Sequence, residues 1–250
     1  IQTNSDGSAP TTGTLSSADD NIGIGDSVFT ALTSGNKNVA IGNNAFATGT
    51  TAEKNVAVGY NSMASYVKGD KNVAVGMQSL WGSTGDDNTA VGKGALGSNT
   101  TGATNTAVGR DALNSNTTAS ANTAVGRHAL EANTTGANHT AVGHYALKIN
   151  TTGETNSALG GYTLRQNTTG SQNTAVGYGA LNNTPTADNN TAVGYNSLYA
   201  NTGGVDNTAV GKSALAANTI GAENTSVGYE ASATNTTGSK NAVLGRGAFF

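Results

Sequence analysis

The sequence predicts an all-β protein: a parallel β-roll, or β-solenoid, built from coils of 17 residues. One observation is a segment, Asn-Thr-Ala-Val-Gly, that recurs with small changes from Asn21 onwards. A second is its spacing, because twelve of the thirteen intervals between its closing glycines are 17 residues and one is 16. A third is composition, with 35 glycines and only 5% aromatic residues, too few large side chains for a conventional core. A strict period of this length is typical of repeat architectures that stack identical layers.

Two segments follow from where the repeat begins. Residues 1–20 are polar, small and free of the motif, so they are expected to be a lead-in or linker. Residues 21–250 hold fourteen copies, of which the last is incomplete, so we expect a piece of a longer protein. The single 16-residue interval predicts a local irregularity around 81–87, as a shortened turn.

Each coil can be numbered from position 1, the asparagine, to position 17. Positions 2 and 4 carry Thr or Val and an aliphatic residue, while positions 3 and 5 carry Ala and Gly. This alternation predicts a short strand with positions 2 and 4 on its buried side and a shallow Ala and Gly face opposite. The residues expected to carry the fold are Gly59, Gly76, Gly92, Gly109, Gly126, Gly143, Gly160, Gly177, Gly194 and Gly211 at position 5, Val91, Val108, Val125 and Val142 at position 4, and Leu96, Leu113, Leu130 and Leu147 at position 9.

The second half of each coil holds Ala-Leu and then Asn-Thr-Thr-Gly. Helix is disfavoured because the turn signal leaves too few uninterrupted residues, fewer than the roughly 12 to 15 that an isolated helix needs. Ala-Leu is therefore expected on a second short strand, and Asn-Thr-Thr-Gly in a turn whose glycine takes positive φ. The asparagines at position 1 are expected to stack on one another as a ladder of side-chain amides.

A single roll of this kind would bury little apolar surface per coil. Each coil offers to its interior one Val or Ile and one Leu or Phe, and each large aliphatic side chain is worth about 1.5 to 3 kcal/mol when fully buried. The smooth Ala and Gly face could let three rolls meet around a common axis, so we expect a homotrimer.

Composition also bounds the function. The net charge of −3 provides no basic field for nucleic acid. The sequence contains no run of about 18 apolar residues, so we expect no direct insertion into a membrane. Cysteine is absent, and the acidic residues are scattered over turns rather than paired as glycan hydrolysis requires. We expect no enzyme activity, catalytic residue, cofactor or resident metal.

The repeat resembles known surface fibres. Residues 38–42 (NVAIG) and 55–59 (NVAVG) look like the repeat of YadA-like head domains of trimeric autotransporter adhesins. The NTAVG…AL…NTTG form is similar to repeats of bacteriophage tail fibres. The resemblance covers about residues 21–250 and implies a left-handed trimeric roll, extracellular on a virion or bacterial surface, that attaches to a host receptor such as a glycan or surface polymer. The 17-residue period departs from the bacterial heads, where it is commonly nearer 14, which favours a viral tail fibre or spike shaft; the alternative is a bacterial adhesin head.

Position 6 is the candidate binding position, because long aromatic or cationic side chains recur there. They would form a stripe along the roll that could bind sugars or an acidic surface polymer. Alternatively, their stems pack over the coil edge and across the boundary between protomers, with acids of the turns such as Glu154, Asp188, Asp206 and Glu223 within reach. The candidate residues are Tyr178, Tyr195, Tyr229, Arg110 and Arg127, with Tyr60, Lys93, His144, Lys212 and Arg246 at the same position.

Two further possibilities need separate mention. The three histidines, His128, His139 and His144, are expected to face solvent, the alternative being a metal on a trimer axis. Flat threonine arrays on β-rolls can bind ice, but here the strand threonine interchanges with valine, which argues for burial. We therefore expect a structural and adhesive fibre segment.

Overall fold

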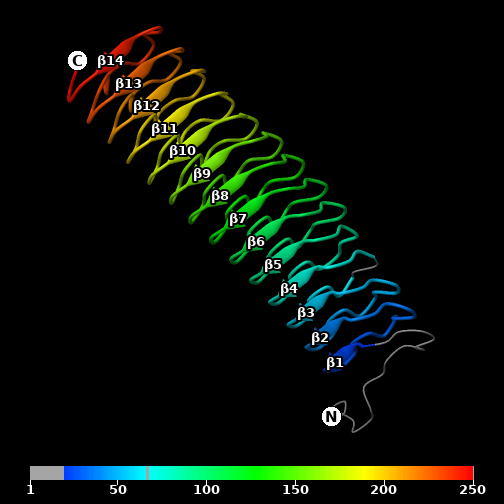
Figure 1. Cartoon of the computed structure of the whole chain (residues 1–250). Coiled ribbons are helices and arrows are strands. Elements are labelled where there is room, and N and C mark those ends of the chain that lie inside the picture. Colours follow the sequence, from blue (N-terminus) through cyan, green and yellow to red (C-terminus); the bar gives the residue numbers. More distant parts are fainter. Residues whose placement is uncertain (1–19, 66–67, 250) are drawn as a thin grey trace. The chain divides into compact units, whose positions relative to one another are not determined.

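The fold is a parallel β-solenoid, as the spacing predicts. A computed structural model describes residues 20–65 and 68–249, and the chain divides into two compact units, Ile1–Asn122 and Thr123–Phe250. In each unit the coils stack so that one strand per coil pairs in parallel with the next, offset by one repeat (Figure 1). Most of the proposed lead-in, residues 1–19, lies outside the described residues.

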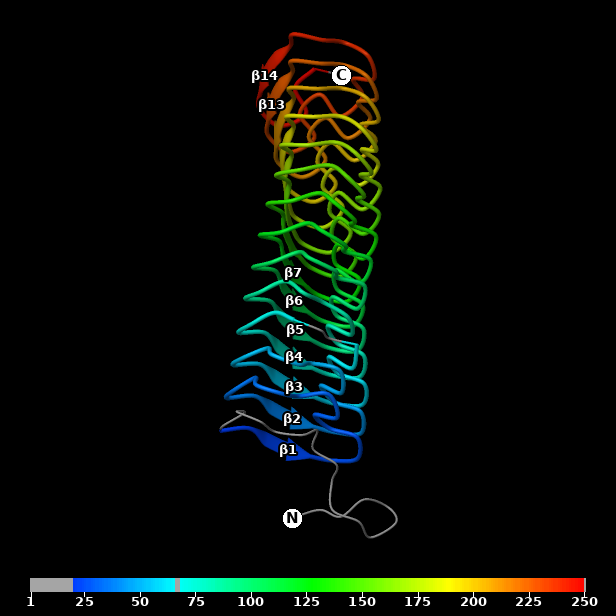
Figure 2. The ribbon, with the colours of Figure 1, turned by 90° about the vertical axis from the view of Figure 1, so that its right-hand side faces the viewer.

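Every strand spans positions 2 to 4, and strand order follows the sequence within each unit. The register is regular: Ala90 lies opposite Ala107 in the first unit and Ala192 opposite Ala209 in the second. Figure 2 views the same stacked coils from another side. The first unit holds β1 (Ile22–Ile24), β2 (Val39–Ile41), β3 (Val56–Val58), β4 (Val73–Val75), β5 (Thr89–Val91) and β6 (Thr106–Val108); the second holds β7 (Thr123–Val125), β8 (Thr140–Val142), β9 (Ser157–Leu159), β10 (Thr174–Val176), β11 (Thr191–Val193), β12 (Thr208–Val210), β13 (Thr225–Val227) and β14 (Ala242–Leu244).

The predicted burial of the strand faces is wrong. The alanine at position 3 is the buried residue, with no exposed surface at Ala90 or Ala107, whereas Val75 at position 4 is 37% exposed. The reason is the thinness of the coil. A Cβ added at Gly23, which holds position 3 of β1, would lie 3.0 Å from a side-chain carbon of Val28 and 3.1 Å from one of Phe29. Only a very small residue fits between the two walls, so the larger residues face outward.

The predicted second strand is also absent from the described residues. Ala-Leu lies in a turn in which left-handed residues recur, at φ 51° for Leu96 and φ 55° for Asp111. This segment still joins neighbouring coils: the Leu96 N–H donates to the Ala112 carbonyl at 3.0 Å, and the Asp111 N–H donates to the Lys93 carbonyl at 2.9 Å. The left-handed leucine costs about 1–2 kcal/mol, which its complete burial offsets.

Position 5 of the coil accepts only glycine. Gly92 has φ 133°, and a Cβ there would lie 2.5 Å from the carbonyl oxygen of Gly109 in the next coil. Both the backbone conformation and the close approach of the neighbouring coil require glycine. This explains why the residue recurs in all fourteen copies.

Two ladders of asparagine side chains run through the coils. The predicted ladder at position 1 is confirmed: Oδ1 of Asn88 accepts from the backbone N–H of Asn105 at 3.0 Å and from its side-chain amide at 3.2 Å. A second ladder, which the sequence did not predict, lies at position 12. There Nδ2 of Asn116 donates to Oδ1 of Asn99 at 2.8 Å. Both sets of amides are buried, so their mutual hydrogen bonds are what makes their burial possible.

The Asn-Thr-Thr-Gly segment forms a turn, but its glycine does not have the predicted positive φ. Gly102 is needed because of the close approach of Ala119 in the next coil, whose carbonyl oxygen a Cβ would contact. The 16-residue coil has the shortened turn that was expected. There Ser83, Thr84 and Gly85 replace four residues, and the Ser83 hydroxyl accepts from Nδ2 of Asn99 at 2.9 Å.

Candidate functional site

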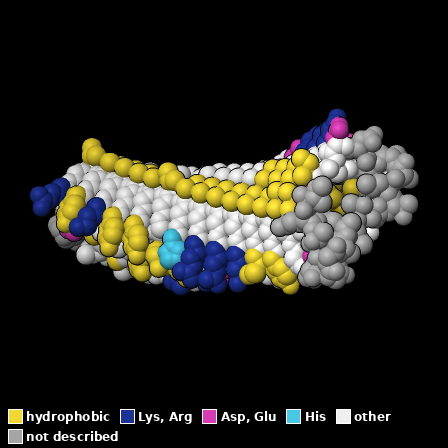
Figure 3. Space-filling model, turned by 90° about the horizontal axis from the view of Figure 1, so that it is seen from below, with side chains coloured by type: hydrophobic (Ala, Val, Ile, Leu, Met, Phe, Trp, Pro, Cys, Tyr) yellow, Lys and Arg dark blue, Asp and Glu magenta, His cyan; other side chains and the backbone are white. Residues whose placement is uncertain are grey.

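The position-6 stripe lies on the outside of the coils. Tyr178 is 53% exposed, Tyr195 49%, and the side chain of Arg110 55%. Tyr229 and Arg127 are also exposed. Within each unit Figure 3 shows a line of basic and hydrophobic side chains along one edge of the coils, and in the second unit this line includes histidine.

Within the single chain, two of the turn acids, Glu223 and Asp188, have partners outside this stripe. Arg110 pairs at 2.9 Å with Asp111, its own neighbour. Of the turn acids, Glu223 pairs with Lys240 at 3.9 Å, and Asp188 accepts from the backbone N–H of Ser171 at 2.7 Å. Each of these two acids interacts with a residue in the turn of a neighbouring coil.

In the second unit a continuous series of rings combines side chains of the position-6 stripe with two side chains from position 7. The ring centroids of His144 and Tyr145 are 3.9 Å apart, those of Tyr145 and Tyr162 are 5.4 Å apart, and those of Tyr162 and Tyr178 are also 5.4 Å apart. Tyr178 and Tyr195 then stack at 5.8 Å with an angle of 11° between their planes. We call these five side chains the ring ladder. Tyr145 and Tyr162 were not predicted to belong to this surface, because they occupy position 7, one residue beyond the stripe. Their recurrence at the same position in adjacent coils was the available signal.

Cationic side chains lie against the ring ladder. Lys148 Nζ is 4.9 Å from the ring centroid of Tyr145, and the guanidinium carbon of Arg165 is 5.6 Å from that of Tyr162. Further along the second unit, Lys212 Nζ and the guanidinium carbon of Arg246 each lie 5.2 Å from the ring centroid of Tyr229. Cations in such positions are attracted to the ring faces. The surface therefore offers flat apolar faces and positive charge together, which suits a polymer that carries ring-shaped groups or acids.

The histidines do not all face solvent as expected. His139 is buried in the position-1 ladder, and desolvation there lowers its pKa to about 4. His128 is almost buried and its Nδ1 lies 3.1 Å from a carboxylate oxygen of Glu131. His144 belongs to the ring ladder, where burial lowers its pKa, and the charges of Arg127 and His128 lower it further.

A second surface feature is the outward side of the strands. Position 4 carries Ile, Val or Leu in every copy, and these side chains face away from the coil interior; we call them the aliphatic row. Leu159 is 50% exposed and Ile41 37%. Figure 3 shows hydrophobic side chains following the strands in each unit, apart from the position-6 stripe. Contiguous exposed apolar surface of this kind marks interaction sites.

The described part of the chain holds no group of three or more His, Cys, Asp or Glu side chains arranged to bind a metal ion. Over the same residues there is no helix with the length and hydropathy needed to cross a bilayer. No protein-family model, curated protein or solved structure matches the chain.

Proposed function

We propose that this chain is the shaft of a trimeric surface fibre, a left-handed roll of the bacteriophage tail-fibre or spike kind, which supports attachment to a host surface. The observation that carries the proposal is the aliphatic row. It recurs once per coil, so a second and third copy in the same register would present matching rows along the whole contact. The resemblance of the repeats to fibre and adhesin repeats points in the same direction.

The trimer interface proposed here differs from the one expected from the sequence. The Ala and Gly face cannot join three chains, because the alanines fill the interior of each coil. The aliphatic row and the position-2 side chains beside it remain exposed and apolar enough to be covered by sister chains. Burial of such side chains contributes about 25 cal/mol per Å² of apolar area, which adds stability that the thin interior does not supply.

Light scattering on the purified protein tests the assembly. We expect the mass of three chains for the unmodified protein, and a shift to monomer when Val91 and Val108 are both changed to Asp. The matched control changes Thr101 and Thr118, exposed turn residues of the same two coils, to Asp and should leave the trimer intact. A monomeric mass for the unmodified protein contradicts the proposal.

The attachment role is tested on cells. Trimers labelled with a fluorophore should bind intact bacteria through the exposed stripe and ring ladder, and replacing Tyr178 and Tyr195 with Ala should weaken binding without changing the mass. Loss of trimers with unchanged binding would instead assign these tyrosines to assembly. The bacterial adhesin head is the alternative, and the sequence of neighbouring segments in the full protein separates the two, since a membrane-anchor domain would indicate the adhesin.

Ice binding keeps one supporting observation. None of the position-2 threonines is buried as expected: Thr140, Thr174 and Thr225 are exposed, and the others are half-buried. Each strand nevertheless places only one threonine on the outer face, beside an aliphatic residue. Thermal hysteresis of the purified protein would favour this function, and its absence would remove it.

A further inference from the structure

We propose that a hollow in the first unit, beside Trp81, binds the ring of a neutral sugar. The inference rests on the proposed function, because an attachment fibre gives a sugar site its use, and it names the ligand class of one surface of that fibre. It has a test of its own.

The hollow arises from missing side chains. In the coil of residues 88–104, positions 7 and 10 are both glycine, Gly94 and Gly97. Position 10 carries Trp81 in the preceding coil and Asn114 in the following one. The gap between these two has a volume of about 210 Å³, several times the roughly 30 Å³ that one water molecule occupies in the liquid.

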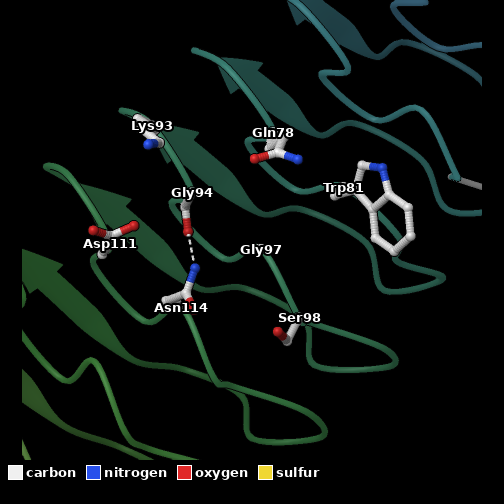
Figure 4. Close-up of a pocket in the computed structure, with 8 residues that line it drawn as sticks. All are labelled: Gln78, Trp81, Lys93, Gly94, Gly97, Ser98, Asp111 and Asn114. Carbon is white, nitrogen blue, oxygen red and sulfur yellow. Dashed lines mark hydrogen bonds between the residues drawn. The ribbon is translucent and has the colours of Figure 1, made fainter.

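The walls of the hollow have different chemistry. Figure 4 shows the indole of Trp81 on one side, Asp111 and Asn114 on the opposite side, and the bare backbone of Gly94 and Gly97 between them. Trp81 is 45% exposed, so its ring is available as a platform. An aromatic face carries negative partial charge, and it attracts the C–H face of a pyranose ring, whose hydrogens carry positive partial charge.

Polar groups surround this platform. Gln78, Ser98, Asn114 and Lys93 offer donors and acceptors at the rim, and Asp111 offers a carboxylate. Asn114 is held in place because its Nδ2 donates to the Gly94 carbonyl at 2.7 Å. One apolar wall with several fixed polar groups is the usual composition of a small-ligand site. The lining carries one cation, Lys93, and one carboxylate, Asp111, which also pairs with Arg110 at 2.9 Å. Because this carboxylate offsets the positive charge beside it, a neutral polyhydroxylated ring fits the hollow best.

The single tryptophan of the chain makes this site easy to observe. Tryptophan emission is recorded while glucose, galactose, mannose or N-acetylglucosamine is added. We expect a saturable change with at least one of these sugars, with a midpoint of about millimolar, as weak single-ring binding implies. No saturable change with any of the four sugars would overturn the proposal.

Two variants locate the binding. Gly97→Arg fills the hollow and displaces the Asn114 amide, because a Cβ at Gly97 would lie 2.9 Å from Nδ2 of Asn114. Position 10 can hold arginine, since Arg165 occupies it in another coil. This change should weaken sugar binding at least tenfold, whereas Ala216→Arg, at position 10 of a coil in the second unit, should leave it unchanged. Trp81→Ala should abolish binding measured by ligand-observed NMR, and Tyr199→Ala should not. Undiminished binding in Gly97→Arg would assign the sugar to another surface and overturn the proposal.

The two proposals fail separately. A protein that forms trimers but does not respond to sugar loses this site and keeps the fibre assignment. A monomeric protein that binds sugar at Trp81 keeps the site and loses the fibre assignment.

Discussion

The imidazole of His139 donates its Nε2–H to the carbonyl oxygen of Gly153 at 2.6 Å. Its Nδ1 accepts from the backbone N–H of Asn156 at 3.1 Å. The neutral ring thus replaces the side-chain amide that other coils place at position 1, with one donor and one acceptor in the required directions. In a protonated ring Nδ1 carries a hydrogen and cannot accept from the backbone N–H of Asn156, so that hydrogen bond is lost.

This geometry predicts a loss of stability in mild acid. The pKa of His139 falls from 6.5 to about 4 on folding because of desolvation. Between these values the unfolded chain binds more protons than the folded one, so the free energy of unfolding decreases as the pH is lowered from about 6.5 towards 4. One pKa unit corresponds to about 1.4 kcal/mol, so the loss from this residue is at most about 3 kcal/mol.

Urea unfolding at neutral pH and near pH 4.5, for the protein and for His139→Asn, measures this effect. The variant restores the amide used by the other coils and should lose less stability in acid. An equal loss in both proteins would show that His139 does not titrate in this range.

Two adjacent glycines offer a matched pair. Gly160 has φ 132°, and a Cβ there would lie 2.9 Å from the backbone carbonyl of Gly177. Gly161 has no left-handed φ, and a Cβ there would lie 3.4 Å from a ring carbon of Tyr178. Gly160→Ala should lower the free energy of unfolding by about 3 kcal/mol, since it combines backbone strain with a backbone clash.

Gly161→Ala should change the free energy of unfolding by less than about 1 kcal/mol. The change is an increase if the reduced conformational freedom of the unfolded chain is the larger effect. Denaturant midpoints of the two variants provide the comparison. Similar losses for both would contradict the role assigned to position 5.

The buried hydroxyls of Ser226 and Ser232 form a hydrogen bond of 2.9 Å in the second unit. They occupy positions 3 and 9, where the coil before has Ala209 and Leu215. Replacing both serines, as Ser226→Ala with Ser232→Leu, should raise the free energy of unfolding by about 2 kcal/mol through added apolar burial.

Ser226→Ala alone should instead destabilise by about 1–2 kcal/mol, because it leaves the Ser232 hydroxyl buried without this partner. Thermal or denaturant unfolding of the two single variants and the double variant completes the cycle. Additive effects of the two changes would contradict coupling between the hydroxyls.

The candidate surfaces were predictable only in part. Tyr178, Tyr195 and Arg110 could be assigned to an exposed stripe because they recur at one repeat position. Trp81 could not be recognised as the wall of a hollow, because the hollow depends on glycines in the next coil and on Asn114 in the coil beyond.

The sequence by itself determined the period, the parallel order of the strands, the ladder of position-1 amides and the shortened turn at 83–85. These follow from spacing, since identical residues one repeat apart must lie in register. Only the tertiary structure decided which strand face is inside. An alternation of residues such as Ala90 and Val91 defines two faces, but the width of the coil selects between them. These coils are thin enough that the small residue of the pair, Ala90, faces inward and the larger one, Val91, faces outward.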